Sequence, residues 1–378
     1  MRVLLTTDTI GGVWTYTREL TEGLLRASVA VALVSFGRLP SEDQLAWCHT
    51  VAGRHPALFE YHFSDTPLEW MSDNECVYEL GVPLLQRVAR EFRADLLHSN
   101  QYCFGRFPHG IPRLVTAHSD VISWSKACTS EALEPGRWIT TYKTLVQEGL
   151  LAADTLVAPT RWMLDALTST FQVPRRILVV GNGRTISSRR RSTARSMQAV
   201  SVGRLWDPAK NLSLLSSLPA SVPIFVAGEQ RYGEAGIPGL VETFTSLGPL
   251  SEEAVLSLFR SSSIYLCTSI YEPFGLAPLE AALCGCAVLA NDIPSLREVW
   301  GDAARYFADA PTLSFLLEEL ISNPEELRRC QKQSLRRAQH WTAQRMTSGY
   351  MSIYRSLLAR GSSASSISRI AEGDLCVA

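Results

Sequence analysis

Short apolar runs alternate with amphipathic segments along most of the chain. The first run, residues 2–6, is followed by a glycine turn and then by apolar residues spaced like one face of a helix: Val13, Tyr16, Leu20 and Leu24. Further strands are predicted at 29–35, 95–98, 113–116, 155–158 and 177–180, and a second series at 199–202, 222–227, 264–267 and 287–290. Strands that alternate with helices are typical of parallel βαβ units, so the fold class is α/β.

The two series of strands indicate two domains, as expected for a chain of 378 residues. We predict an amino-terminal domain over 1–183 and a carboxy-terminal domain over 197–338. The segment between them, 184–196, contains five arginines among serines and threonines and is typical of a solvated linker. The alternative is a basic patch that touches an anionic membrane. A last helix is predicted over 324–358, with 339–360 returning to the first domain and 361–378 forming a flexible tail.

Composition excludes several classes of protein. Lys and Arg number 36 against 37 Asp and Glu, so the chain lacks the cationic excess that nucleic-acid binding needs. The longest uncharged apolar stretch, 281–290, is far shorter than the ~18 residues of a membrane span. The nine cysteines form no C-x-x-C pair, and no standard ligand spacing suggests a metal site. We therefore expect a cytoplasmic protein. If the basic linker binds lipid, we expect it to be peripheral at the inner face of the membrane.

Candidate polar groups follow two strands of the first series. Gly11 and Gly12 lie between a strand and a helix, where the backbone can approach a ligand closely and free N–H groups can meet an anion. His118 follows the strand at 113–116, and His98 ends the preceding strand. An imidazole at the carboxyl end of a strand can donate to a sugar hydroxyl or a phosphate, although a structural histidine is the alternative.

Two cations and two carboxylates follow strands of the second series, as the first candidate groups follow strands of the first series. Arg204 and Lys210 follow its first strand, and together they can grip a diphosphate as a fork and a point charge. Glu272 lies on a Pro/Gly loop after the strand at 264–267, and Glu280 lies in the first turns of the next helix. A carboxylate accepts two hydrogen bonds, which suits paired hydroxyls of a sugar or ribose. The N–H groups at 274–276 can meet phosphate oxygens.

Two glutamates separated by seven residues, E-P-F-G-L-x-x-L-E-A, resemble the signature of glycosyltransferase family 4, which has the GT-B fold. Matching motifs follow in order along nearly the whole chain: Gly11-Gly12, Asp95-Leu96-Leu97-His98, Ala153-Asp154 with Pro159-Thr160, Asn182-Gly183, Gly203-Arg204-Leu205 with Lys210-Asn211, and Pro294-Ser295-Leu296-Arg297-Glu298-Val299. The chain departs from the family pattern at Arg184 and Thr185, where a hydrophobic residue and Asp usually stand.

The resemblance implies two Rossmann-like, doubly wound domains that face a central cleft. It implies donor-binding residues in both: Gly11, Gly12, Arg204, Lys210, Glu272, Phe274, Gly275, Leu276 and Glu280. Glu280 would accept from ribose hydroxyls and Glu272 from the sugar. Arg204 and Lys210 would neutralise the diphosphate, and His118 would contact the sugar near the anomeric centre. We count His118, Glu272, Arg204 and Lys210 as catalytic.

The implied activity is that of a retaining hexosyltransferase. It takes a UDP- or GDP-sugar as co-substrate, and its acceptor is a glycan, a lipid-linked saccharide or a small molecule. Because the sequence contains no D-x-D pair, we expect no metal and no other cofactor. The alternatives are a sugar-nucleotide epimerase or phosphorylase of the same architecture, and a non-catalytic sugar-nucleotide binding protein.

Overall fold

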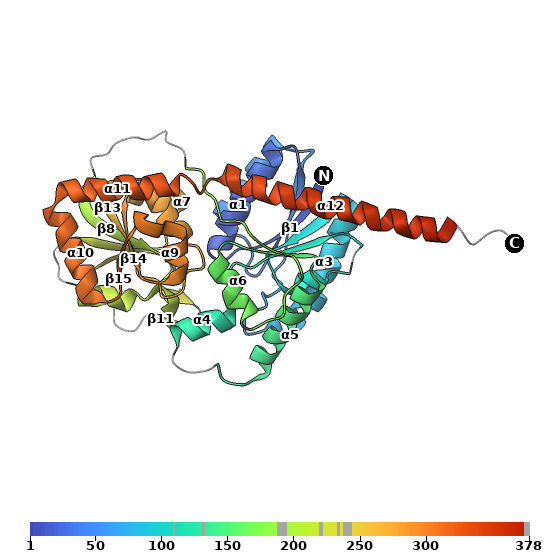
Figure 1. The fold of residues 1–378 in the computed structure, drawn as a ribbon, viewed down its shortest axis with the longest axis horizontal. Coiled ribbons are helices and arrows are strands. Elements are labelled where there is room, and N and C mark those ends of the chain that lie inside the picture. Colours follow the sequence, from blue (N-terminus) through green and yellow to red (C-terminus); the bar gives the residue numbers. More distant parts are fainter. Residues whose placement is uncertain are drawn as a thin grey trace.

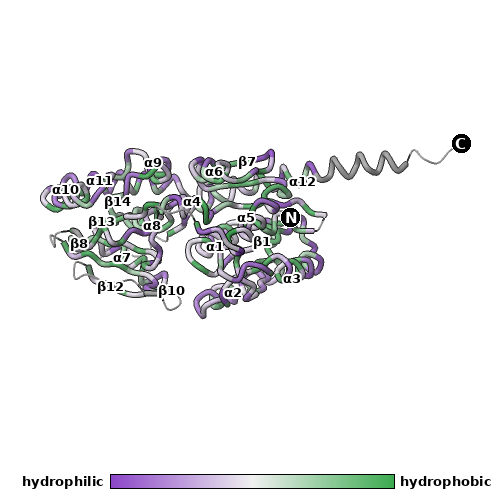
Figure 2. The backbone as a smooth tube through the Cα atoms, turned by 90° about the horizontal axis from the view of Figure 1, so that it is seen from below, coloured by the Kyte–Doolittle hydropathy of each residue, from purple (hydrophilic) through white to green (hydrophobic). Residues whose placement is uncertain are grey.

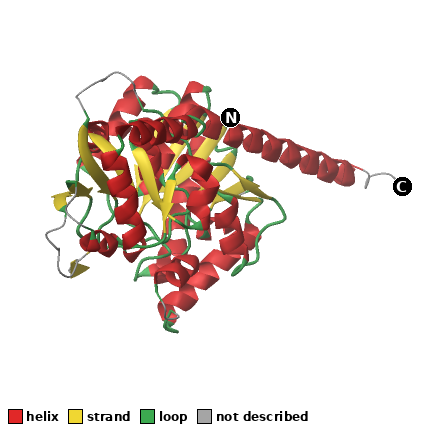
Figure 3. Cartoon of the chain, turned by 60° about the vertical axis from the view of Figure 1, so that its left-hand side comes forward, coloured by secondary structure: helices red, strands yellow, loops and turns green. Residues whose placement is uncertain are grey.

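The chain folds into two α/β domains that lie side by side (Figure 1). This computed structural model describes residues 1–108, 110–129, 133–186, 195–218, 222–232, 235–236 and 244–373. The linker residues 187–194 and the last tail residues, 374–378, therefore lie outside the described residues. Helices cover both faces of each sheet (Figure 3), which gives the doubly wound architecture that the sequence predicts.

The amino-terminal sheet has seven parallel strands in the order β3-β2-β1-β4-β5-β6-β7. Its strands are β1 (Arg2–Asp8), β2 (Ala30–Phe36), β3 (Phe59–Phe63), β4 (Leu96–Ser99), β5 (Arg113–Thr116), β6 (Thr155–Ala158) and β7 (Ile177–Val179). All but β3 were expected from the apolar runs. β3 lies at the edge of the sheet and is only half-buried, so its residues lack the continuous apolar character of a central strand.

The carboxy-terminal sheet has six parallel strands in the order β12-β9-β8-β13-β14-β15. Its strands are β8 (Ser196–Val202), β9 (Ile224–Ala227), β12 (Thr245–Gly248), β13 (Ser262–Cys267), β14 (Ala287–Asn291) and β15 (Arg305–Phe307). The two edge strands, β12 and β15, are short and were not predicted. A small antiparallel pair, β10 (Arg231–Tyr232) and β11 (Ala235–Gly236), stands apart from this sheet.

The helices of the amino-terminal domain are α1 (Gly12–Arg26), α2 (Glu42–Arg54), α3 (Val77–Phe92), α4 (Val121–Cys128), α5 (Arg137–Ala152) and α6 (Arg161–Thr168). Those that follow are α7 (Glu252–Ser261), α8 (Leu276–Leu283), α9 (Pro294–Trp300), α10 (Ala310–Ser322), α11 (Pro324–Ala338) and α12 (Ala343–Gly373). Short 3₁₀ turns occupy Asn74–Cys76, Cys103–Arg106, Pro208–Lys210, Leu212–Ser217 and Gly301–Ala303. Side chains cap several helix starts, among them Asp120 at α4 and Thr160 at α6.

The end of the chain differs from the single helix predicted over 324–358. Two helices, α11 and α12, are separated by a turn at 339–342, because α11 packs in the carboxy-terminal domain and α12 against α1 of the other. Tyr350 and Tyr354 of α12 are buried in the amino-terminal core. α12 also continues to Gly373, through a segment predicted as a flexible tail, since no proline interrupts it. Figure 1 shows it running across the amino-terminal domain and beyond.

His98 is part of this core and does not face the cleft, which corrects its place among the candidate residues. Its Nδ1 lies 2.6 Å from the Tyr354 hydroxyl and its Nε2 lies 2.7 Å from Thr116 Oγ1, and the ring is fully buried. Nδ1 therefore ties α12 to the sheet and Nε2 bonds to the neighbouring strand β5, so both ring nitrogens are used and the imidazole has a structural role.

The apolar residues gather around the two sheets and the polar ones outside them (Figure 2). Separate buried clusters flank each sheet, so each domain has its own core. Within the described residues, no helix combines the length and the apolar character that a membrane crossing requires.

Candidate functional site

The carboxyl ends of the two sheets meet, and the glycine turn before α1 faces the other domain. A side-chain carbon on Gly12 would lie 3.6 Å from Leu276 Cδ1, and one on Gly11 would lie 3.8 Å from a terminal nitrogen of Arg204. Gly11 also has φ = +80°, a conformation that glycine adopts readily. The structure thus brings Gly11, Gly12, Arg204 and Leu276 together across the domain interface.

Lys210 and Glu272 form a close ion pair at the end of the carboxy-terminal sheet. Lys210 Nζ lies 2.6 Å from Glu272 Oε2, and Ser269 Oγ lies 3.2 Å from the same oxygen. Burial alone would lower the pKa of Lys210, but the Glu272 carboxylate outweighs it and the pKa is raised. The ammonium is therefore charged at neutral pH. Both side chains keep some exposure, so a ligand can reach them.

Arg204 is held by a carboxylate of its own domain. Its guanidinium lies 2.7 Å from Asp207 Oδ2, and Asp207 also accepts from Ala209 N and, across the interface, from Trp124 Nε1. The Arg204 side chain is 37% exposed, against 3% for Asp207. Arg204 thus presents a charge toward Gly11 while a buried partner fixes its direction.

A tight turn sets Glu272 beside the start of α8. Gly275 has φ = +90°, and a side-chain carbon there would come within 2.8 Å of Pro278 Cγ and 3.3 Å of Glu272 Cγ. Only glycine fits without displacement. The Phe274 ring is buried against Trp341, with 5.3 Å between ring centroids. The side chain of Phe274 is therefore a packing group, and only its backbone is available to a ligand.

Glu280 lies apart from the Lys210–Glu272 pair and bonds instead to Arg184. Arg184 Nε donates to Glu280 Oε1 over 2.6 Å. Burial raises the pKa of Glu280, and the charge and hydrogen bond of Arg184 act in the opposite direction. The sequence did not single out Arg184 as a site residue. Its departure from the family pattern was the signal that could have identified it.

His118 is positioned by a hydrogen bond to Asn100. Asn100 Nδ2 donates to Thr6 O over 2.6 Å, which turns Asn100 Oδ1 toward His118 Nε2, at 2.8 Å. This network assigns the proton to Nε2 and leaves Nδ1 as an acceptor. The ring of Tyr16 packs edge-on against the imidazole. Burial lowers the pKa of His118 to about 3, so the ring is neutral at physiological pH.

Two buried carboxyl groups at this end of the amino-terminal sheet were not found from the sequence. Asp8 ends β1 and accepts from Ile10 N at 3.0 Å; Glu69 accepts from Tyr102 N at 2.6 Å. Burial raises the pKa of each to about 7. The position of Asp8 between a strand and a glycine turn could have identified it. Glu69 lies in a loop whose sequence offers no such signal.

Tyr271, the residue before Glu272, anchors the site loop to the amino-terminal domain. Its hydroxyl accepts from Asp120 N at 3.1 Å and lies 2.9 Å from Ser123 Oγ. Thr160 Oγ1 donates to Pro273 O over 2.9 Å, from the same domain. The amino-terminal domain therefore fixes the loop at two points, and Lys210 holds Glu272 from the carboxy-terminal side.

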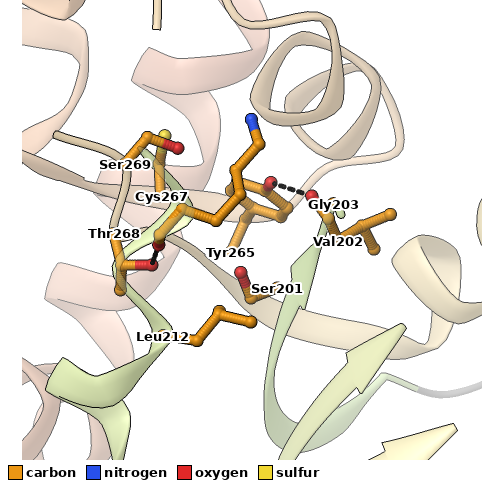
Figure 4. Close-up of a pocket in the computed structure, with 9 residues that line it drawn as sticks. Ser201, Val202, Gly203, Leu212, Tyr265, Cys267, Thr268 and Ser269 are labelled. Carbon is orange, nitrogen blue, oxygen red and sulfur yellow. Dashed lines mark hydrogen bonds between the residues drawn. The ribbon is translucent and has the colours of Figure 1, made fainter. Parts of the chain in front are cut away.

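A small pocket lies beneath this loop, at the carboxyl ends of β8 and β13 (Figure 4). Its lining is about half polar and half apolar: Ser201, Val202, Gly203, Lys210, Leu212, Tyr265, Cys267, Thr268 and Ser269. Thr268 Oγ1 donates to Lys210 O over 2.6 Å, which ties the Lys210 turn to β13. Among the side chains that the structure describes, no cluster of three or more His, Cys, Asp or Glu has the arrangement of a metal site.

Two family models match the two halves of the chain. The description "Glycosyltransferase Family 4" covers residues 10–187, and "Glycosyl transferases group 1" covers residues 198–337. A D-inositol 3-phosphate glycosyltransferase of Segniliparus rotundus is 27% identical over 94% of this chain and 86% of its own length. An MMP alpha-(1->4)-mannosyltransferase of Mycolicibacterium hassiacum is 30% identical, but over only 39% of this chain and 36% of its own length.

Solved structures share the architecture at low sequence identity. The sucrose-phosphate synthase of Thermosynechococcus elongatus superposes with a TM-score of 0.77 at 17% identity, over 95% of this chain and 100% of that chain. Anabaena HepE, in complex with UDP and glucose, superposes with a TM-score of 0.72 at 16% identity, over 94% and 100%. These likenesses confirm the two-domain GT-B fold. The two family models together span most of the chain and identify it as a glycosyltransferase of the family 4 type.

Proposed function

We propose that the chain is a retaining hexosyltransferase that moves a sugar from a UDP- or GDP-sugar to a hydroxyl of a glycan, a lipid-linked saccharide or a small molecule. The observation that carries this proposal is the meeting of Gly11 and Gly12 with Arg204 and Leu276 across the interface. Glycines that leave room next to cations and a helix start suit a diphosphate. HepE, a structural neighbour, binds UDP and glucose, which supports a nucleotide sugar as donor.

The chemical problem is the departure of the diphosphate. Negative charge develops on the phosphate oxygen as the bond to the anomeric carbon breaks, and fixed positive groups lower the cost. Lys210 and Arg204 supply two such charges, and the amino terminus of α8 adds the free N–H groups of its first turn. We propose that these groups neutralise the diphosphate without a metal ion. Retention of the anomeric configuration rests on the family to which the chain belongs.

The remaining polar groups suit hydroxyls. Glu272 can accept from the sugar, and Lys210 keeps its carboxylate in place. Neutral His118 donates from Nε2 to Asn100, so its Nδ1 can accept from a hydroxyl near the anomeric centre. Glu280 can accept from the ribose. Of the five linker arginines, Arg184 pairs with carboxylates and Arg195 donates to backbone carbonyls of the carboxy-terminal domain, so neither is free to meet a membrane. Contact of the other three with an anionic membrane stays a prediction, because residues 187–194 lie outside the described residues.

A donor screen tests the proposal. UDP, GDP and ADP with their hexose derivatives are added singly, and a donor is expected to raise the melting temperature by mass action. The best donor is then incubated with candidate acceptors, and the anomeric configuration of the product is read by NMR. Stabilisation by no nucleotide, or a product of inverted configuration, would refute the corresponding part of the proposal.

Two controls separate the alternatives. Chelator should leave turnover unchanged; loss that manganese or magnesium restores would contradict metal independence. A phosphorylase would release sugar phosphate only after inorganic phosphate is added, and an epimerase would convert the nucleotide sugar with no acceptor present. Nucleotide binding without any of these reactions would indicate a binding protein.

A further inference from the structure

Arg184 lies where the chain crosses between the two domains. Its backbone N–H donates to Trp341 O over 3.0 Å, which ties the first crossing to the second, at 339–342. Its side chain is almost fully buried, and each guanidinium nitrogen donates to a different carboxylate: Nε to Glu280, one terminal nitrogen to Glu19 and the other to Glu252.

The three carboxylates come from both domains. Glu19 belongs to α1 of the amino-terminal domain, whereas Glu252 begins α7 and Glu280 lies in α8 of the carboxy-terminal domain. Glu19 also accepts from the backbone N–H of Thr185. Glu252 additionally pairs with Arg18 of α1. One side chain therefore links a donor-site carboxylate to a helix of the opposite domain.

Stability alone is a weak reason for such a cluster. Removing charges from water costs free energy that their attraction only partly returns, and apolar groups of similar volume often serve as well. The cluster does fix directions, because a planar guanidinium with three partners has a single orientation. Glu280 Oε1 is held by Arg184, and within the described part of the chain no hydrogen bond reaches Glu280 Oε2. One oxygen is fixed, and the other can serve a ligand.

We propose that Arg184 is a positioning residue for ribose recognition: it holds Glu280 through Oε1, leaves Oε2 to accept a ribose hydroxyl, and through Glu19 makes this arrangement depend on the approach of the amino-terminal domain. The inference rests on the proposed donor site and adds to it a residue outside the expected set. Ribose recognition and domain closure then share one side chain, so each favours the other.

Discrimination between ribose and deoxyribose tests this role. Titration calorimetry compares the nucleoside diphosphate that the parent binds most tightly with its 2′-deoxy and 3′-deoxy forms. The parent should prefer the ribose form over at least one deoxy form by about tenfold or more, because a buried acceptor without its hydroxyl is left unpaired. Arg184→Gln should reduce this ratio to below about threefold, as should Glu280→Gln.

Arg18→Gln is the matched control, since it removes a guanidinium that pairs with Glu252 but does not touch Glu280. It should keep the parental ratio. If Arg184→Gln does not fold, Glu19→Gln replaces it, because this variant retains Arg184 and removes only the charge of its amino-terminal partner. The preference of Glu19→Gln for the ribose form should be about threefold lower than that of the parent.

The outcomes separate the inference from the proposed function. The inference is overturned if folded Arg184→Gln keeps the ratio of the parent. If that variant does not fold, the same outcome in Glu19→Gln overturns it. A ratio near one in the parent protein overturns it too, because the parent would then not distinguish ribose from deoxyribose. The same holds if the ratio falls in Arg18→Gln as much as in Arg184→Gln. Parent protein that binds no nucleoside diphosphate would instead overturn the proposed function.

Discussion

The carboxyl ends of the two sheets differ in the charge of their polar side chains. In the carboxy-terminal domain Lys210 and Arg204 carry full positive charges, each oriented by a carboxylate and each partly exposed. In the amino-terminal domain Asp8 and Glu69 are buried with pKa values of about 7, and His118 has a pKa of about 3. The first end suits an anion, whereas at the second end burial disfavours the charged form of each of these three side chains.

This difference follows from what surrounds the side chains. An exposed cation beside a carboxylate stays charged, whereas a buried carboxyl group or imidazole favours its neutral form where the cost of burial exceeds the attraction of any nearby opposite charge, such as that of Arg204 on Asp8. A diphosphate on one side and the hydroxyls of a sugar or acceptor on the other match the two ends. The cleft can therefore orient its two substrates by charge.

Loss of a cation from the carboxy-terminal side should have the largest effect. Lys210→Ala removes a charge from the leaving group and also leaves Glu272 without its partner, so turnover should fall about 100-fold, equivalent to about 2.7 kcal/mol. Arg204→Ala should lower turnover at least tenfold. Release of nucleoside diphosphate from the best donor measures both. Lys143→Ala, an exposed lysine on α5, is the control. Activity within twofold of the parent in both site variants would remove the proposed role.

The two glutamates sharpen the assignment within the carboxy-terminal side. Glu272→Ala should reduce transfer about tenfold or more yet leave the affinity for the bare nucleoside diphosphate within about threefold, because its carboxylate is assigned to the sugar. Glu280→Ala should weaken that affinity directly. Calorimetric titration of the nucleotide against both variants decides between them. An equal loss of affinity would show that the roles are wrongly assigned.

The sequence was a better guide to the carboxy-terminal side than to the amino-terminal one. Glu272, Glu280, Arg204 and Lys210 follow central strands whose apolar runs are easily recognised, so their place at the carboxyl ends of these strands could be predicted, whereas their roles stay a prediction. Glu69 comes from a loop and bonds to Tyr102 and Cys103, which lie far along the chain, and its raised pKa depends on burial that only the folded chain creates.

The same limit explains the errors at the ends of the sheets and of the chain. Edge strands such as β15 are short and half-polar, because one side lacks a neighbour. The turn between α11 and α12 depends on which domain each helix packs against, a long-range fact that helical periodicity does not contain. His98 has the same sequence context as His118, and only the packing of α12 separates a structural imidazole from a candidate site residue.

The buried carboxyls allow a direct test of the amino-terminal side. The folded pKa of Asp8, about 7, lies above its ordinary value of 3.8 because of burial. The associated stability is therefore present below about pH 4 and is lost as the pH rises toward 7. Asp8→Asn keeps an acceptor for Ile10 N but does not ionise. The melting temperature of the variant relative to the parent should increase between pH 5 and pH 8, by roughly 2–4 °C for each kcal/mol of stability that the parent loses over this range.

Glu69→Gln should behave in the same way, since Tyr102 N keeps its acceptor. An exposed carboxyl provides the control: Glu42→Gln, in the first turn of α2, should show no such trend. A difference in melting temperature that is constant with pH for both Asp8 and Glu69 variants would mean that these groups are ionised throughout, and that the amino-terminal side is not neutral.

The smallest expected effect concerns the contact between the two sides. Tyr271→Phe keeps the ring against Trp162 but removes the hydroxyl that bonds to Asp120 N and Ser123. The Glu272 loop then loses one anchor to the amino-terminal domain, and kcat should fall about threefold. Nucleotide affinity should change by less than that, because Arg204, Lys210 and Glu280 all belong to the carboxy-terminal side and Arg184 still links the two domains. Tyr306→Phe is the matched control, because that hydroxyl bonds within its own domain, to Leu296 O and Gly301 O. Equal changes in kcat for the two variants would trace the effect to the lost hydroxyl itself, and a change of about threefold or more in nucleotide affinity for Tyr271→Phe would show that the two sides do not divide their tasks as the charges suggest.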